Sequence, residues 1–357
     1  MTPSFGGMLN VQEWDFGGAL LKVRFAAALE AGVSRYPVYR NVQFAARLAL
    51  DELFDSLALN LGWRAQRLDT ASLIVESDGL FATAIGHRKS EYCSCHISMW
   101  ADSLARIESA RAAVLALVGS SRITEPMFTI DWHFLTGKGE LEDASIEELA
   151  NDRLHDEAYP YLENGVTTFI EGYLRAPETV LVLQGPPGTG KTRLIRAILG
   201  ALARRQGGHA TALYTGDKKT MESDQIFVKF ITGWHQAFVV EDADHLLRPR
   251  AEGNENLHRF LSIADGVVRS QGRKIVFSTN LPNVGDLDDA LIRPGRCFAH
   301  LMTRALTPLE AERLGAALLE PGHPDRATLI ERLSRGDAKG QSLADVYRTV
   351  AGTDRDW

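Results

Sequence analysis

Eight consecutive residues, 185–192, have the types and order of a phosphate-binding loop. They match the pattern Gly-x-x-x-x-Gly-Lys-Ser/Thr at each fixed position, after an apolar stretch and before a helical pattern. Glycines let the backbone curl so that its N–H groups point at phosphates, and the following helix adds its positive N-terminal end. The loop would comprise Gly185, Pro186, Pro187, Gly188, Thr189, Gly190, Lys191 and Thr192. We expect Lys191 to reach the β- and γ-phosphates of ATP and the Thr192 hydroxyl to ligate Mg²⁺.

Two carboxylates follow a second apolar stretch, about 50 residues further along the chain. Glu241 and Asp242 come directly after residues 237–240, Ala-Phe-Val-Val. Such a stretch is typical of a buried strand in a parallel sheet, and ligands of these sheets bind at the carboxyl ends of the strands. A phosphate site needs acidic groups there to hold the metal ion and to activate water. The two acids are candidates for these tasks.

An amide and two arginines follow a third apolar stretch. Residues 274–278 lead into Thr279 and Asn280, and Arg293 and Arg296 flank a Pro-Gly turn further on. An amide at the end of a strand can orient a water molecule beside the γ-phosphate. Guanidinium groups can stabilise the negative charge that develops on the transferring phosphoryl group, often from a neighbouring subunit.

In order and spacing, these motifs resemble the AAA clade of the AAA+ ATPases. The resemblance covers residues 179–300 by motif, through GPPGTGKT, the acidic strand end, STN and LDDALIRPGR, and residues 150–351 by architecture. It implies a nucleotide-binding α/β domain with a helical lid, assembled as a homo-oligomeric, hexameric ring with ATP between subunits. It also implies that Asn280 is the polar sensor and that Arg293 and Arg296 are arginine fingers. Residues 307–351 look like the lid.

The acidic pair departs from the usual order of this clade, which is Asp followed by Glu. Here Glu241 precedes Asp242. By position, Glu241 would hold the magnesium shell and Asp242 would be the base. The reversed order is similar to that of the mitochondrial Rieske-protein translocase branch. The shorter base bears on the rate of hydrolysis and not on ATP binding.

A second departure concerns the central pore. Protein unfoldases of the clade usually carry an aromatic residue and a glycine in the segment that here reads GDKKTMES, residues 216–223. This segment has no aromatic residue, and Lys218 and Lys219 would make a ring of such loops basic. That again looks more like the translocase branch than like threading unfoldases. The alternative is that both lysines belong to a solvated turn.

Apolar stretches separated by helix-length segments predict a parallel sheet covered by helices on both faces. These stretches are residues 179–183, 212–215, 237–240 and 274–278. Three short helical patterns follow within residues 307–351. The predicted fold class is therefore α/β, a P-loop NTPase parallel sheet with a C-terminal helical lid.

The first part of the chain predicts a small α+β domain with an antiparallel sheet. Helical spacing occurs at residues 17–31, 40–61 and 103–117, and strand patterns occur at residues 72–76, 80–85, 92–100 and 126–134. From residue 145 the pattern turns helical again. We expect an N-terminal recognition or docking domain (1–145), an ATPase domain (146–306) and a lid (307–357).

Composition limits the other function classes. The 357 residues are 45% hydrophobic and 24% charged, which is typical of globular proteins, and no apolar run is long enough to span a bilayer. Without a secretory signal pattern or a disulfide framework, the expected location is the cytoplasm. Cys93 and Cys95, with His96 beside them, provide too few ligands for a typical zinc site, so ordinary thiols are favoured.

Charge is uneven along the chain, whose net charge is −7. Residues 1–150 contain 13 Lys and Arg against 19 Asp and Glu, which disfavours binding of a phosphate backbone by this half. The favoured function is a ring ATPase that remodels or translocates a protein partner, with the N-terminal domain recognising a client or adaptor. A nucleic-acid-stimulated ATPase is an alternative, supported by Lys218, Lys219, Arg248 and Arg250. Another is an ATP-gated assembly scaffold.

Overall fold

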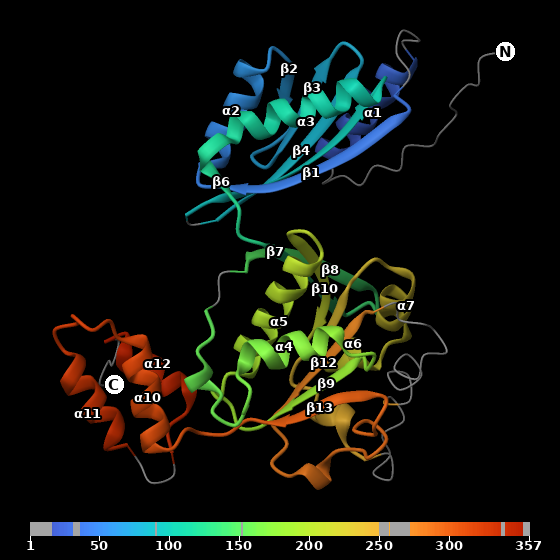
Figure 1. Cartoon of the computed structure of the whole chain (residues 1–357). Coiled ribbons are helices and arrows are strands. Elements are labelled where there is room, and N and C mark those ends of the chain that lie inside the picture. The colour runs from blue at the N-terminus through green and yellow to red at the C-terminus, as the bar shows by residue number, and fades with distance from the viewer. Residues whose placement is uncertain are drawn as a thin grey trace. The chain divides into compact units, whose positions relative to one another are not determined.

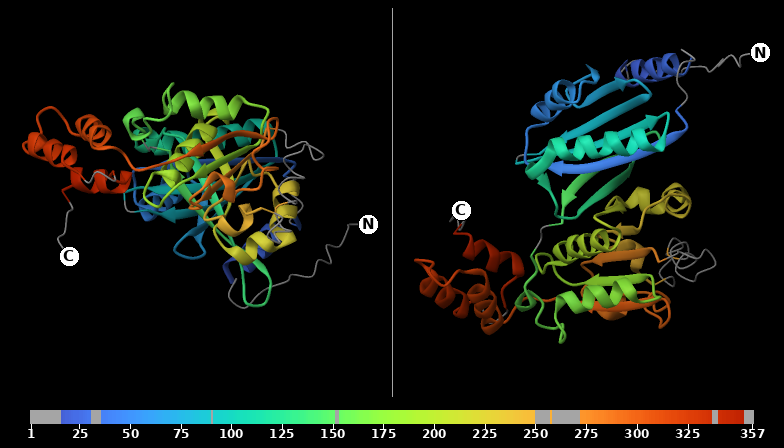
Figure 2. Two further views of the ribbon diagram at one scale, coloured as in Figure 1. Left: turned by 90° about the horizontal axis from the view of Figure 1, so that it is seen from below. Right: turned by 45° about the horizontal axis from the view of Figure 1, so that its top comes forward.

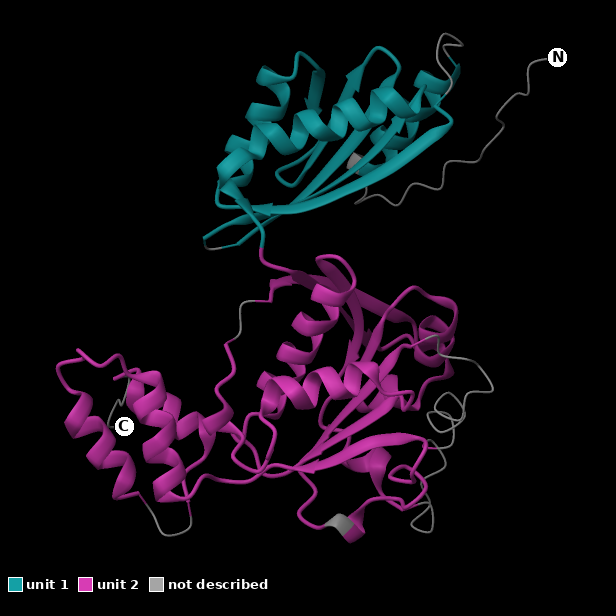
Figure 3. Ribbon diagram, in the orientation of Figure 1, with its two compact units in different colours: residues 1–124 teal, residues 125–357 magenta. Residues whose placement is uncertain are grey.

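The computed structural model describes residues 16–30, 36–89, 91–150, 153–249, 257, 272–336 and 340–352 (Figures 1 and 2). The chain divides into two compact units, Met1–Thr124 and Glu125–Trp357 (Figure 3). Each unit has its own sheet and its own hydrophobic core.

The first unit contains an antiparallel sheet with the strand order β2-β3-β4-β5-β1-β6. Helices α2 and α3 bury Phe54 and Ile107 against one face of this sheet. On the opposite face, Phe25 of α1 lies 5.0 Å from the ring of Trp100. The elements are α1 Phe16–Glu30, β1 Val38–Ala46, α2 Leu50–Asn60, β2 Arg64–Arg67, β3 Ser72–Ser77, β4 Leu80–Arg88, β5 Cys93–Ala101, α3 Leu104–Val118 and β6 Arg122–Ile123.

The single helix expected over residues 40–61 was wrong for its first part, which forms strand β1. Val42 and Phe44 are buried on either side of the more exposed Gln43, and β1 pairs with β5 along its length, from Val38↔Ala101 to Ala46↔Cys93. Period-two and helical spacings overlap in such a short stretch, and pairing with neighbouring strands decides between them.

The second unit is built on a seven-stranded sheet of order β13-β9-β12-β11-β10-β7-β8. All neighbouring strands are parallel except β7 and β8, so the α/β fold is confirmed, with a mixed sheet in place of a purely parallel one. Its strands are β7 Met127–Leu135, β8 Leu141–Leu149, β9 Val180–Gln184, β10 His209–Thr215, β11 Ala237–Val240, β12 Lys274–Thr279 and β13 Cys297–Met302.

Helices cover both faces of this sheet. On one face, α4 and α5 pack over Leu181 and Val239, and on the other, α6, α7 and α8 pack over Val182 and Phe238. The helices are α4 Val166–Arg175, α5 Lys191–Arg205, α6 Lys218–Glu222, α7 Asp224–Thr232 and α8 Asp244–Leu247. Strands β9 and β11 are buried along their whole length, which explains their continuous apolar sequence.

The β7–β8 hairpin belongs to the second unit, although the sequence analysis assigned residues 126–134 to the first. β7 pairs in parallel with β10, from Met127↔His209 to Trp132↔Tyr214. The residues from 145 onward, which were predicted to be helical, form the second half of strand β8. The structure thus divides the chain after Thr124 and not after residue 145.

Three helices end the described chain, α10 Pro308–Leu318, α11 Arg326–Ser334 and α12 Leu343–Val350. They occupy the region in which three short helical patterns were expected. Thr307 and Ser342 cap α10 and α12 through capping boxes with Glu310 and Asp345, which fixes where these helices begin. Among the helices of the described residues, none joins the length and the apolar character that crossing a bilayer requires.

Replacing Phe128 with alanine is expected to lower the free energy of unfolding of the second unit by about 3–5 kcal/mol, because its ring is fully buried in that unit's core. Phe134→Ala on the same strand, where the residue is 39% exposed, should cost about 1 kcal/mol or less. Urea unfolding, with hydrogen exchange at β10 amides, would measure both. Equal losses would contradict the place of the hairpin in this core.

Candidate functional site

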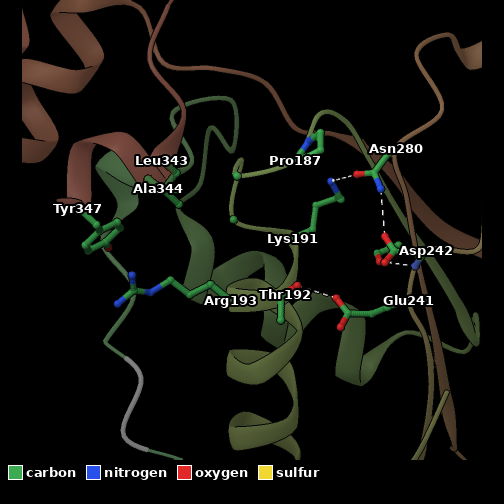
Figure 4. A pocket seen from close by; sticks show the side chains of 13 residues that line it. Pro187, Lys191, Thr192, Arg193, Glu241, Asp242, Asn280, Leu343, Ala344 and Tyr347 are labelled. Atoms are coloured by element: carbon green, nitrogen blue, oxygen red, sulfur yellow. Dashed lines mark hydrogen bonds between the residues drawn. The ribbon is translucent and has the colours of Figure 1, made fainter. Parts of the chain in front are cut away.

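The phosphate-binding loop lies between β9 and α5, at the carboxyl edge of the parallel strands. A cavity of about 580 Å³ opens there (Figure 4). The loop residues Gly188 and Lys191 line it together with acidic and amide groups from the ends of β11 and β12 and with residues of α12. Four elements far apart in sequence therefore meet at one cavity.

The loop can take its shape only because glycines stand at its crowded points. Gly185 has φ of +151°, and a Cβ atom there would lie 2.1 Å from the carbonyl oxygen of Thr303. Gly190 has φ of +91°, and its carbonyl accepts a hydrogen bond from the Tyr159 hydroxyl at 3.0 Å. The Thr189 and Thr303 hydroxyls are 2.7 Å apart. These contacts hold the loop from outside the cavity.

Lys191 is 8% exposed and reaches across the floor of the cavity. Its Nζ donates to the carbonyl oxygens of Gly185 at 2.6 Å and Pro186 at 3.0 Å, and to Oδ1 of Asn280 at 2.9 Å. Burial lowers the pKa of Lys191, and the nearby carboxylates, Asp242 foremost, oppose this shift. The three acceptors are oxygens, the type of atom that a phosphate also offers.

Glu241 is held from two sides. Its Oε1 accepts a hydrogen bond from the Thr192 hydroxyl at 2.6 Å, and its Oε2 accepts one from the Tyr214 hydroxyl at 2.9 Å. The short contact brings a hydroxyl oxygen and a carboxylate oxygen together at the cavity wall. Oxygen donors of this kind suit Mg²⁺.

Asp242 has φ of +51° and is the one non-glycine with positive φ among the residues that the structure describes. Strained backbone of this kind is often found at functional sites. Its Oδ1 accepts a hydrogen bond from Nδ2 of Asn280 at 3.0 Å. The backbone N–H of Asn280 donates in turn to Oδ1 of Asp244 at 2.8 Å. One amide thus joins Asp242 to Lys191.

Comparison with known proteins agrees with this geometry. Residues 181–304 match the family described as "ATPase family associated with various cellular activities (AAA)". The chain carries an AAA ATPase domain. This match does not distinguish between branches of the family, so the similarity of the reversed acidic pair to the translocase branch stays a prediction.

Three curated relatives illustrate the range of proteins that share this domain. An "AAA ATPase forming ring-shaped complexes" of Micrococcus luteus is 26% identical over 257 residues, 60% of this chain and 41% of the relative. An "ATP-dependent zinc metalloprotease YME1 homolog" of Caenorhabditis elegans is 33% identical over 132 residues, which cover 34% of this chain and 18% of the relative. A "Proteasome-associated ATPase" of Acidothermus cellulolyticus is 26% identical over 322 residues, which cover 78% of this chain and 52% of the relative. The chain spans about half or less of the length of each.

Of the thirteen predicted site residues, eight line the cavity and five do not. The eight are Pro187, Gly188, Gly190, Lys191, Thr192, Glu241, Asp242 and Asn280, and the loop residues Gly185, Pro186 and Thr189 lie outside the lining. Arg293 and Arg296 lie in the loop before β13 and do not line the cavity. Arg293 is exposed, and the guanidinium of Arg296 donates to the carbonyl oxygen of Ala290.

Sequence reasoning missed several residues at or next to the cavity. Tyr214 and Asp244 each form a hydrogen bond with a predicted residue without lining the cavity. Tyr214 stands at the end of a predicted strand, and Asp244 follows the predicted acidic pair by two residues; these positions are the signal that could have revealed them. From the lid, Tyr347 lines the cavity, and the Arg193 guanidinium lies 4.0 Å from the centre of its ring. The N–H of Ala344 also donates to the carbonyl oxygen of Gly188 at 3.0 Å.

Two other groups from the sequence analysis lie elsewhere. Lys218 and Lys219 begin helix α6 with exposed side chains, and Lys218 is 3.9 Å from a carboxylate oxygen of Glu222. Arg250 lies outside the described residues. Cys93 and Cys95 are buried cysteines of β5 that are not joined in a disulfide, and the described ranges hold no cluster of three or more His, Cys, Asp or Glu suited to a metal ion.

Proposed function

We propose that the AAA domain binds ATP with Mg²⁺ and hydrolyses it, releasing the γ-phosphate. The observation that supports this most is the convergence of Lys191, Thr192, Glu241, Asp242 and Asn280 on one cavity. The loop amides and Lys191 would hold the β- and γ-phosphates. The oxygens of Thr192 and Glu241 fit Mg²⁺, which when bound would neutralise negative charge between these phosphates.

The remaining side chains supply the chemistry of hydrolysis. Asp242 would take the proton of the attacking water, since Oδ1 accepts from Asn280 and, within the described part of the chain, no donor contacts the other carboxylate oxygen. Asn280 would orient that water and keep Lys191 in place. Arg293 and Arg296 would act on the γ-phosphate of a neighbouring subunit, because neither lines the cavity of its own chain.

The partner on which this ATPase acts is proposed to be a protein. One relative is named for forming ring-shaped complexes and another for its association with the proteasome, and this supports a homo-oligomeric ring, expected to be a hexamer, that remodels or translocates a protein partner. The first unit would recognise a client or adaptor in the cytoplasm. Residues 1–124 contain 12 Lys and Arg and 12 Asp and Glu, so this unit has no excess of positive charge to attract a phosphate backbone.

Two alternatives rest on particular observations. The exposed Lys218 and Lys219 would support a nucleic-acid-stimulated ATPase, although Glu222 and Asp217 beside them reduce the local positive charge. The short, reversed base Asp242 would support a scaffold that binds ATP without turning it over. Measured turnover separates the second alternative from the proposal.

Lys191→Ala is expected to weaken ATP binding about tenfold or more, because the buried ammonium is lost from the phosphate position. Asp242→Asn should leave ATP binding intact and lower hydrolysis about 100-fold or more. Lys229→Ala, which removes a lysine paired with Asp143 away from the cavity, should change neither. Equilibrium ATP binding and phosphate release would measure these effects. Unimpaired hydrolysis by Asp242→Asn would contradict the assigned base.

Mixing two inactive variants would test whether the arginine comes from a neighbour. Arg293→Ala should lower hydrolysis about 1,000-fold, whereas Arg175→Ala on the exposed surface of α4 should not. A mixture of Arg293→Ala and Lys191→Ala should regain part of the activity, since some interfaces then combine an intact loop with an intact arginine. A mixture as inactive as its components would speak against supply in trans.

The kind of partner would be tested by adding protein and nucleic acid separately. We expect turnover to be insensitive to DNA and RNA at low salt, because the exposed lysines lie beside carboxylates. Crosslinking in the presence of ATP should capture a protein with Asp242→Asn and not with Lys191→Ala. Strong stimulation by DNA or RNA that disappears with added salt would favour the nucleic-acid alternative.

A further inference from the structure

A tyrosine at the end of β10 has no part in the proposed reaction, yet it contacts the proposed metal-holding acid. The hydroxyl of Tyr214 donates to Oε2 of Glu241 at 2.9 Å, and the hydroxyl of Thr192 donates to Oε1 at 2.6 Å. Both oxygens of this carboxylate are therefore held, by donors from β10 and from α5. Tyr214 itself does not line the cavity, so its influence must pass through Glu241.

The ring of Tyr214 is fixed by the sheet. Tyr214 lies opposite Trp132 of β7 in the strand register, and the two rings meet edge to face with their centres 5.7 Å apart. The ring also packs against the core beneath α5. Burial raises the pKa of Tyr214, and the charge and hydrogen bond of Glu241 raise it further, so the hydroxyl stays a proton donor.

A glutamate at this position needs such support more than an aspartate would. Its side chain has one more rotatable bond, and each bond that must be ordered costs free energy. Thr192 restrains only one carboxylate oxygen, which leaves rotation about the bond that carries the carboxylate. A second donor from a rigid strand removes this freedom.

We propose that Tyr214 is a positioning residue that fixes the carboxylate of Glu241, so that Glu241 and Thr192 present their oxygens together to Mg²⁺. The inference rests on the proposed function and deepens it by assigning how the metal-holding glutamate is oriented. Tyr214 acts without touching nucleotide or metal. Its loss should therefore affect the contribution of Mg²⁺ to binding and not the binding of the nucleotide alone.

Tyr214→Phe keeps the ring and its contact with Trp132 but removes the hydroxyl. The affinity for a non-hydrolysable ATP analogue should fall about tenfold in the presence of Mg²⁺, as is typical for loss of a partner behind a metal ligand, and should not change in its absence. The Mg²⁺ concentration for half-maximal hydrolysis should rise by a similar factor. Equilibrium binding with and without Mg²⁺ provides a readout independent of activity.

Tyr173→Phe is a matched control. The Tyr173 hydroxyl is buried too, and it donates to the carbonyl oxygens of Thr179 at 2.8 Å and Ile275 at 3.0 Å, away from the cavity. Its loss should lower the melting temperature without changing the Mg²⁺ dependence. If both variants changed the Mg²⁺ dependence alike, a general loss of stability would explain the effect and the inference would fall.

A double-mutant cycle tests whether Tyr214 acts through Glu241. Glu241→Asp shortens the side chain by one methylene group, so its carboxylate should no longer reach the tyrosine. In that background, Tyr214→Phe should have no further effect on Mg²⁺-dependent binding. An effect as large as in the unmodified chain would overturn the inference.

The outcomes for the unmodified chain separate the two proposals. If it does not bind the ATP analogue with Mg²⁺, the proposed function fails. If it binds the analogue with Mg²⁺ and Tyr214→Phe binds it within twofold under all conditions, only the role of Tyr214 is refuted.

Discussion

The hydrogen bonds of one amide connect the parts of the candidate site. Oδ1 of Asn280 accepts from Lys191 and its Nδ2 donates to Asp242, so one planar group sets the distance between the phosphate-binding loop and an acid in the turn after β11. Asp244 fixes this amide by accepting from its backbone N–H. A buried ammonium is tolerated only when acceptors surround it. The arrangement therefore depends on β9, β11 and β12 ending at the same edge of the sheet.

The candidate site also depends on the β7–β8 hairpin, which lies outside the central strands. Without it, β10 would be the edge of the sheet, with unpaired backbone groups and an uncovered Tyr214. Pairing with β7 satisfies those groups and places Trp132 against the tyrosine ring. A segment that begins two residues after the boundary between the units thus supports a residue that contacts Glu241.

Contiguous motifs could be predicted from the sequence because neighbouring residues alone determine the local structure of each motif. The loop at 185–192 and the acids after residue 240 follow apolar strands, and parallel strands bring their carboxyl ends together. The hairpin was assigned wrongly, because residues 141–149 fit a helix or a strand locally and only their pairing with β7 decides. Tyr214 and Asp244 escaped notice for a similar reason, since their partners lie 27 and 36 residues away along the chain.

The order of the two acids fits the backbone around them. Asp242 stands where φ is +51°, a region that aspartate visits more readily than most residues because its short side chain is tolerated there. A glutamate in its place would gain a methylene group where Asn280 already makes contact. An aspartate in place of Glu241 would in turn fall short of Tyr214, which the longer side chain reaches at 2.9 Å. Exchanging the acids would therefore disturb the hydrogen bonds to Asn280 and to Tyr214. The order of the two acids thus depends on the residues around them.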